Sequence, residues 1–180
     1  MLTPKNKDIW APESTESMNI SFLLIGGNEG DRLGQLAKAR ENIELAGCEL
    51  LLQSAVYETA PWGKTDQADF LNQALQIRTS LDAPILMQTL LEIEEKMGRR
   101  RLEKYGSRII DIDILFFNSG IIQLPQLTVP HPEVQNRRFA LVPLDEIAPS
   151  YVHPVLGRTV RELLQVCPDK SAVKKLITSA

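Results

Sequence analysis

Two aspartates, Asp111 and Asp113, interrupt an apolar and β-branched run at residues 109–115. Side chains alternate along a strand, so both carboxylates would project from one face. Such a pair resists burial unless a cation lies between the two charges. Oxygen ligands with no neighbouring Cys or His suit Mg²⁺, which binds one or two carboxylates together with substrate phosphates. The alternative interpretation is an edge strand whose polar face is solvated.

The stretch that leads into this run, residues 98–108, carries five basic side chains and two glycines. Its composition is typical of a mobile cationic loop. Arginine binds phosphate oxygens through a planar set of donors, and polyphosphate chemistry combines such cations with a metal to offset the charge of the transferring group. The position of the loop directly before the aspartates favours an anion site over a solvated run of charges.

Weaker patterns lie elsewhere in the chain. Phe70 and Asn72 would share one face of a strand and could stack on and hydrogen-bond a flat heterocycle, although such a pair alone also fits ordinary polarity. His131, followed shortly by Arg137, could complete an anion site, whereas His153 is interpreted as structural. The glycine-rich residues 26–30 lack the spacing of a phosphate-binding fingerprint and are interpreted as a turn and helix entry.

The elements that must position these residues follow from hydrophobic periodicity and from capping and turn residues. The order is strand, helix, strand, strand, helix, strand, which is the ferredoxin-like βαββαβ core of an α+β protein, with both helices on one face of an antiparallel sheet and the other face free. The C-terminal extension is Pro-rich, and its last element is left open between strand and helix. The expected strands are 18–25, 49–58, 70–80, 109–117 and a short 121–124, and the expected helices are 31–46, 82–97 and 159–166.

Composition bounds the class of protein. A chain of 180 residues with 43% hydrophobic and 24% charged residues predicts a single domain at 18–180, preceded by a flexible N-terminal tail at 1–17. The net charge of −3 gives no general attraction to nucleic acid. Two cysteines form no disulfide framework, which fits a reducing cytoplasm, and no run is long enough for a membrane span.

The chain resembles the 6-hydroxymethyl-7,8-dihydropterin pyrophosphokinase family of folate biosynthesis over about residues 18–165. The resemblance rests on KYGSRIIDIDIL at 104–115 and is supported by YETAP at 57–61, DFLN at 69–72 and LTVPHP at 127–132. It implies transfer of pyrophosphate from ATP to the pterin alcohol, which yields the pterin diphosphate and AMP. It also implies a monomer that uses two Mg²⁺ ions and has no nucleic-acid or membrane partner.

The resemblance further implies roles for individual residues. The metal ligands would be Asp111 and Asp113, and the catalytic residues Arg99, Arg108 and Asp113. The ATP-binding residues would be Glu94, Arg101, Lys104, His131 and Arg137. The pterin-binding residues would be Thr59, Ala60, Trp62, Phe70, Asn72, Tyr105 and Phe139, with Phe70 and Phe139 on the two sides of the ring.

Two other functions remain open on the residues alone. A ferredoxin-like sheet can present its free face to RNA, but here that face carries two aspartates, which repel phosphate without a metal. A nucleotidyl transferase of polymerase-palm type also uses spaced aspartates. It would release inorganic pyrophosphate from ATP instead of AMP, so the leaving group separates the two enzymes.

Overall fold

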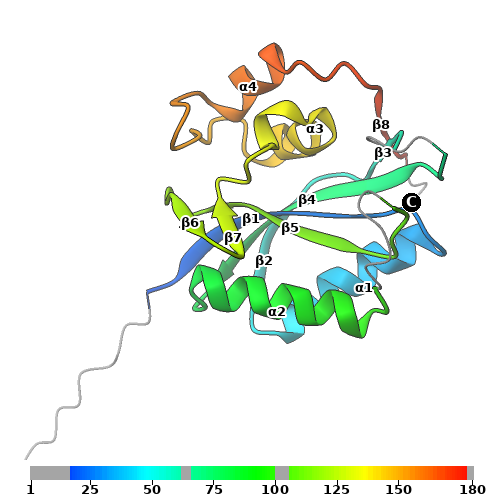
Figure 1. The fold of residues 1–180 in the computed structure, drawn as a ribbon, viewed down its shortest axis with the longest axis horizontal. Coiled ribbons are helices and arrows are strands. Elements are labelled where there is room, and N and C mark those ends of the chain that lie inside the picture. The colour runs from blue at the N-terminus through cyan, green and yellow to red at the C-terminus, as the bar shows by residue number, and fades with distance from the viewer. Residues whose placement is uncertain (1–16, 62–65, 100–105, 178–180) are drawn as a thin grey trace, which may run out of the picture.

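The fold is an α+β arrangement of three layers, seen in a computed structural model that describes residues 17–61, 66–99 and 106–177 (Figure 1). A six-stranded antiparallel sheet lies between two pairs of helices. Its strand order is β5-β1-β4-β3-β8, and β2 also pairs with β4. The strands are β1 (Asn19–Gly27), β2 (Glu49–Gln53), β3 (Tyr57–Thr59), β4 (Phe70–Thr79), β5 (Asp111–Phe117) and β8 (Val173–Lys175), and a separate hairpin pairs β6 (Ile122–Leu124) with β7 (Leu127–Val129).

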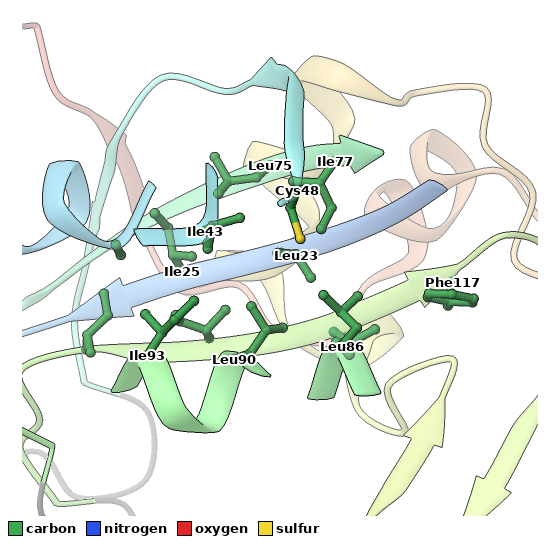
Figure 2. Close-up of a cluster of buried hydrophobic side chains, with 14 of the residues drawn as sticks. Leu23, Ile25, Ile43, Cys48, Leu75, Ile77, Leu86, Leu90, Ile93 and Phe117 are labelled. Atoms are coloured by element: carbon green, nitrogen blue, oxygen red, sulfur yellow. The ribbon is translucent and has the colours of Figure 1, made fainter. Parts of the chain in front are cut away.

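Helices α1 (Arg32–Leu45) and α2 (Ala83–Lys96) cover one face of the sheet (Figure 1). Each begins at a predicted capping aspartate: Asp31 accepts the N–H of Gly34, and Asp82 accepts that of Ile85. Between these helices and the sheet lies an apolar core, part of which is drawn in Figure 2. The predicted βαββαβ core with both helices on one face is therefore confirmed.

The opposite face is covered, which corrects the prediction of a free face. Helices α3 (Arg138–Ile147) and α4 (Val160–Val166) lie over it (Figure 1) and bury a second apolar cluster. That cluster includes Leu24 of β1, Ala74 of β4 and Leu115 of β5. The C-terminal extension thus forms the third layer of the fold.

Helix α3 is absent from the sequence-based expectation because Pro143 lies inside it. Proline lacks the N–H of a helical hydrogen bond, so it reads as a helix breaker in a Pro-rich segment. The predicted strand at 49–58 is two strands, since Ser54 interrupts it: the Ser54 hydroxyl accepts the N–H of Ala74, and the Ser54 N–H donates to the Ala74 carbonyl. The undecided last element is strand β8, which pairs with β3.

Within the described part of the chain, none of the helices has the length and apolar character needed to cross a membrane.

Candidate active site

The predicted site residues meet where β1 ends, on the sheet face that α3 and α4 cover. Gly26 of β1 is paired with Asn72 of β4 on one side and with Asp111 of β5 on the other. A Cβ at Gly26 would lie 2.5 Å from Asn72 Oδ1, too close for any other residue without a shift. The glycine therefore lets the amide predicted to bind the pterin lie directly over β1, beside the strand position that pairs with the first predicted metal ligand.

Asp111 is held between two of the predicted catalytic arginines. Its Oδ1 lies 2.7 Å from Nη1 of Arg99, and its Oδ2 accepts a hydrogen bond from Nη1 of Arg108. The Asp111 side chain is 24% exposed and both guanidinium groups are less so. Burial opposes the charge on Arg99, but the carboxylates of Asp111 and Glu94 outweigh it and raise the pKa of Arg99 above its ordinary value. The site thus keeps two fixed positive charges beside the aspartate.

Glu94 of α2 lies behind this cluster, with only 4% of its side chain exposed. One carboxylate oxygen pairs with Arg99, and the other accepts the backbone N–H of Ile112 at 2.7 Å. Burial raises the pKa of Glu94 even though Arg99 opposes that rise. In this state both oxygens of Glu94 have protein partners, so the residue predicted to bind ATP orients Arg99 and anchors the start of β5.

Asp113 follows Asp111 on the same face of β5, paired across the ladder with Leu24. Burial, together with the charge of Asp111, raises the pKa of Asp113 to about 7, although Arg137 and Arg99 partly offset that rise. A nearby cation would stabilise the charged form of such a buried carboxylate.

The donor set of two carboxylates fits Mg²⁺, which completes its shell with water and substrate phosphates. No group of three or more acidic, His or Cys side chains suited to a metal occurs among the described residues, so the pair alone would not enclose an ion.

His131 and Arg137 lie together next to β5, where the backbone N–H of His131 donates to the backbone carbonyl of Leu115. His131 Nδ1 accepts the N–H of Glu133 at 3.1 Å, which places the proton of a neutral ring on Nε2. That nitrogen lies 3.5 Å from Nη1 of Arg137. Burial, together with Arg137, lowers the pKa of His131 to about 4, so the ring is neutral at pH 7. The two groups thus present neighbouring donors suited to one anion.

Three of the predicted pterin residues, Thr59, Phe70 and Asn72, lie on the other side of Gly26, on β3 and β4. Asn72 Nδ2 donates to the Thr59 hydroxyl at 2.8 Å, and both side chains are buried. The guanidinium carbon of Arg108 lies 5.9 Å from the centre of the Phe70 ring, and that of Arg137 lies 5.7 Å from the Phe139 ring. The two aromatic rings assigned to the pterin are therefore each next to an arginine assigned to phosphate. Ala60 follows β3 and is exposed.

The predictions for four residues lie outside the described part of the chain: Trp62, Arg101, Lys104 and Tyr105.

Three features of the site were missed from the sequence. Besides Gly26, Gly27 permits close approach of the chain before β5, since a Cβ there would lie 2.2 Å from the carbonyl oxygen of Ile109. Asn28 is buried and hydrogen-bonds to the segments before β4 and β5. The sequence signal for Gly26, Gly27 and the adjoining Asn28 was the glycine pair at the end of a strand, because such glycines mark places where another part of the chain lies close to the strand backbone.

Fold and site together define a class: an α+β domain with paired carboxylates, arginines and aromatic rings at one end of an antiparallel sheet, suited to a polyphosphate beside a flat ring. Residues 22–149 match the family model of 7,8-dihydro-6-hydroxymethylpterin-pyrophosphokinase. The chain belongs to this family.

Curated relatives agree with the assignment, and solved structures share the fold. The chain is 43% identical over 160 residues to the 2-amino-4-hydroxy-6-hydroxymethyldihydropteridine pyrophosphokinase of Methylorubrum extorquens, covering 88% of this chain and 99% of that one. It is 38% identical over 163 residues to the protein of the same name from Bacillus subtilis, covering 89% and 98%. Wild-type HPPK-DHPS from Plasmodium falciparum, solved with pteroate, superposes with a TM-score of 0.66 at 19% identity. That match covers 83% of this chain and 44% of the other, so the chain spans less than half of that solved protein.

Proposed function

We propose that this site transfers pyrophosphate from ATP to 6-hydroxymethyl-7,8-dihydropterin, giving the pterin diphosphate and AMP. The family assignment supports this activity, with ATP as co-substrate, and agrees with the activity expected from the sequence. The single observation that carries the residue roles is the row formed by Asn72, Gly26 and Asp111 across three strands. This row places the Asn72 amide, proposed to bind the heterocycle, one strand away, across β1, from the Asp111 carboxylate, proposed to bind a metal.

The phosphate side of the site is assigned to β5 and its neighbours. Asp111 and Asp113 would hold two Mg²⁺ ions, which supply charge neutralisation and a more acidic substrate hydroxyl. Arg99 and Arg108 would stabilise the transferring group, because their ion pairs with Asp111 already hold both guanidinium groups beside the proposed metal site. His131 and Arg137 would bind the nucleotide phosphates through neighbouring donors. Arg101 and Lys104 keep their predicted role in ATP binding, and Glu94 would act on the nucleotide through Arg99.

The pterin side is assigned to β3, β4 and the start of α3. Asn72, oriented by the Thr59 hydroxyl, would hydrogen-bond the edge of the heterocycle. Phe70 and Phe139 would contact its two faces, an arrangement that aromatic stacking favours. Ala60, Trp62 and Tyr105 keep their predicted positions around the ring.

The reaction would proceed by in-line attack of the pterin hydroxymethyl oxygen on the β-phosphorus of ATP. A bond forms between that oxygen and the β-phosphorus, the bond from the β-phosphorus to the bridging oxygen of AMP breaks, and the hydroxyl proton leaves to solvent. No covalent enzyme intermediate is required. The residues of the chain contribute orientation, charge and exclusion of water, which are the main sources of catalysis in phosphoryl transfer.

An assay of ATP conversion with and without the reduced pterin alcohol tests the proposal. We expect AMP to form only when both the pterin and Mg²⁺ are present, and in a one-to-one ratio with the pterin diphosphate. Release of inorganic pyrophosphate would support a nucleotidyl transferase instead. AMP formation that does not depend on the pterin would contradict the assigned substrate.

The proposed unit is a single domain at residues 18–180. The continuous sheet that joins β1 to β8 near the two ends of this range supports it. The monomeric state and the cytoplasmic location stay predictions.

A further inference from the structure

Asn28 connects three segments that are distant in sequence. It follows β1 and is 5% exposed. Its Nδ2 donates to the carbonyl of Ala68 at 2.9 Å and to Oε1 of Gln67 at 3.1 Å, both in the segment before β4. Its Oδ1 accepts the N–H of Arg108 at 2.9 Å, and its own N–H donates to the Arg108 carbonyl at 3.0 Å. One amide side chain thus donates to the segment before β4 and accepts from the segment before β5.

The two segments also touch each other at this point. The Ser107 hydroxyl donates to the same Oε1 of Gln67 at 3.1 Å and lies 3.4 Å from Asn28 Nδ2. Asn28, Gln67 and Ser107 therefore form one small polar cluster around a buried amide. A buried amide with its donors and acceptor engaged is a rigid connection, because each broken bond leaves a desolvated polar group.

Each of the two segments leads into a residue of the proposed site. Residues 66–69 run directly into Phe70, and residues 106–108 end at Arg108. The two side chains are adjacent, with the Arg108 guanidinium carbon 5.9 Å from the Phe70 ring centre. The Asn28 cluster therefore lies directly beside the two residues whose spacing matters: Phe70, proposed for the pterin, and Arg108, proposed for the transferring phosphate.

We propose that Asn28 is a positioning residue that holds the pterin-side segment 66–70 and the phosphate-side segment 106–108 in one fixed arrangement. The proposal rests on the proposed function, because it uses the roles given there to Phe70 and Arg108. Asn28 itself touches neither substrate in this role. A small misplacement of two reacting groups can cost about 10²-fold in rate, so a connection of this kind would matter for turnover.

Two variants separate the connection from a local structural effect. Asn28→Ala removes the amide bonds to both segments, whereas Gln67→Ala removes one acceptor of that amide together with the direct hydrogen bond from Ser107. The matched control is Asn42→Ala, which removes the same kind of side-chain amide. Asn42 lies in the last turn of α1, away from the end of β1. All three proteins and the double variant N28A/Q67A are compared with the parent for kcat, KM for each substrate and Tm.

We expect Asn28→Ala to lower kcat/KM for the pterin by about 10–100-fold, the range that a few hydrogen bonds and a shifted geometry produce. Gln67→Ala should lower it by about 3–10-fold, and Asn42→Ala should match the parent. In the double variant the two losses should be clearly less than additive, since both substitutions weaken the same connection between the segments. Parent-like kcat/KM in Asn28→Ala, or additive losses in the double variant, would overturn the proposal.

Hydrogen exchange supplies a readout that does not depend on activity or on the survival of Asn28→Ala. In Gln67→Ala, a half-buried loop position, amide exchange should rise in peptides that cover 66–72 and also in those that cover 106–112. A rise confined to 66–72 would show that the segments are independent and would overturn the proposal. Failure of the parent protein to form AMP with the pterin would instead count against the proposed function.

Discussion

The two faces of the sheet are both covered by helices, but only one carries chemistry. On the α1 and α2 face the strands contribute apolar side chains such as Leu23, Leu75 and Ile112 to the larger core, part of which Figure 2 shows. On the α3 and α4 face the apolar cluster reaches Leu24 and Leu115, and beyond it toward the end of β1 the half-buried positions are Asp111, Asp113 and Phe70. The polar and aromatic side chains of this face therefore gather beyond the apolar cluster, where β1 ends.

Strand β5 shows the difference between the faces residue by residue. Ile112 and Ile114 belong to the α1 and α2 core, whereas Asp111 and Asp113 alternate with them on the other side. Neighbouring residues are therefore under opposite demands: one side contributes stability, and the other carries partly buried charge that the proposed cation would offset. Substitutions in β5 and around it should therefore affect either stability or activity, depending on the face.

Asp113→Asn should give the largest effect on activity. Loss of one of the two carboxylates proposed to hold the metals should remove several kcal/mol of transition-state stabilisation, so we expect kcat to fall by at least about 10³-fold. Steady-state AMP formation over a range of Mg²⁺ concentrations measures it. The control is Asp145→Asn on α3, which should keep parent activity. Normal turnover in Asp113→Asn would remove the assignment of the aspartate pair as a metal site.

Arg108→Ala should lower kcat by about 10²–10³-fold with a modest change in ATP binding, because a donor aimed at developing charge acts mainly in the transition state. Single-turnover kinetics together with nucleotide titration measure the two effects. Arg161→Ala, which changes an exposed arginine of α4 that pairs with Asp145, is the control with the same change of charge. Turnover close to the parent in Arg108→Ala would contradict its catalytic role.

Ile112→Ala should lower the free energy of unfolding by about 3 kcal/mol, within the range for a large-to-small change in a core. Its side chain is 1% exposed, and the backbone N–H that Glu94 accepts is retained. The urea midpoint should therefore fall while kcat at low temperature stays near the parent value. Ile85→Ala, at a position 52% exposed on α2, should change stability little. A large loss of kcat without loss of stability in Ile112→Ala would show that the faces are not separate.

The pH dependence of stability should give the smallest of these effects. The pKa of Asp113 is raised to about 7 in the folded protein, against about 3.9 when unfolded, so the folded state binds more protons between those values. This contribution to stability is present at low pH and is lost as pH rises through about 7. In the presence of a chelator, the parent should gain about 2 kcal/mol at pH 5.5 relative to pH 8 from this group.

Comparison with Asp113→Asn isolates that contribution, because the variant lacks the titrating carboxylate. Other groups cancel in the difference, including His131, whose lowered pKa acts in the opposite direction as pH falls through 6.5 toward 4. Urea unfolding of both proteins at the two pH values is the measurement. An identical pH dependence of stability in the two proteins would mean that the pKa of Asp113 is not raised in the folded state.

Much of the fold followed from local signals. The two expected helices begin at Asp31 and Asp82, and these residues cap α1 and α2, while Thr159 caps α4 with Glu162 in a capping box. Capping depends on residues within one turn, so the sequence around it suffices. Helix α3 and strand β8 were not predicted, because α3 forms despite Pro143 and β8 forms only by pairing with β3. Both depend on contacts with distant parts of the chain.

The candidate site divides in the same way. Alternation along β5 already placed Asp111 and Asp113 on one face, and their proximity to a basic loop already indicated a polyphosphate. The pairing of Gly26 with both Asn72 and Asp111, the contact of Arg99 with Asp111, and the cluster around Asn28 join residues from separate strands and loops. Chemistry and local geometry are properties of short stretches of sequence, whereas the distance between two stretches is decided by strand register and helix packing, so only the tertiary structure supplied it.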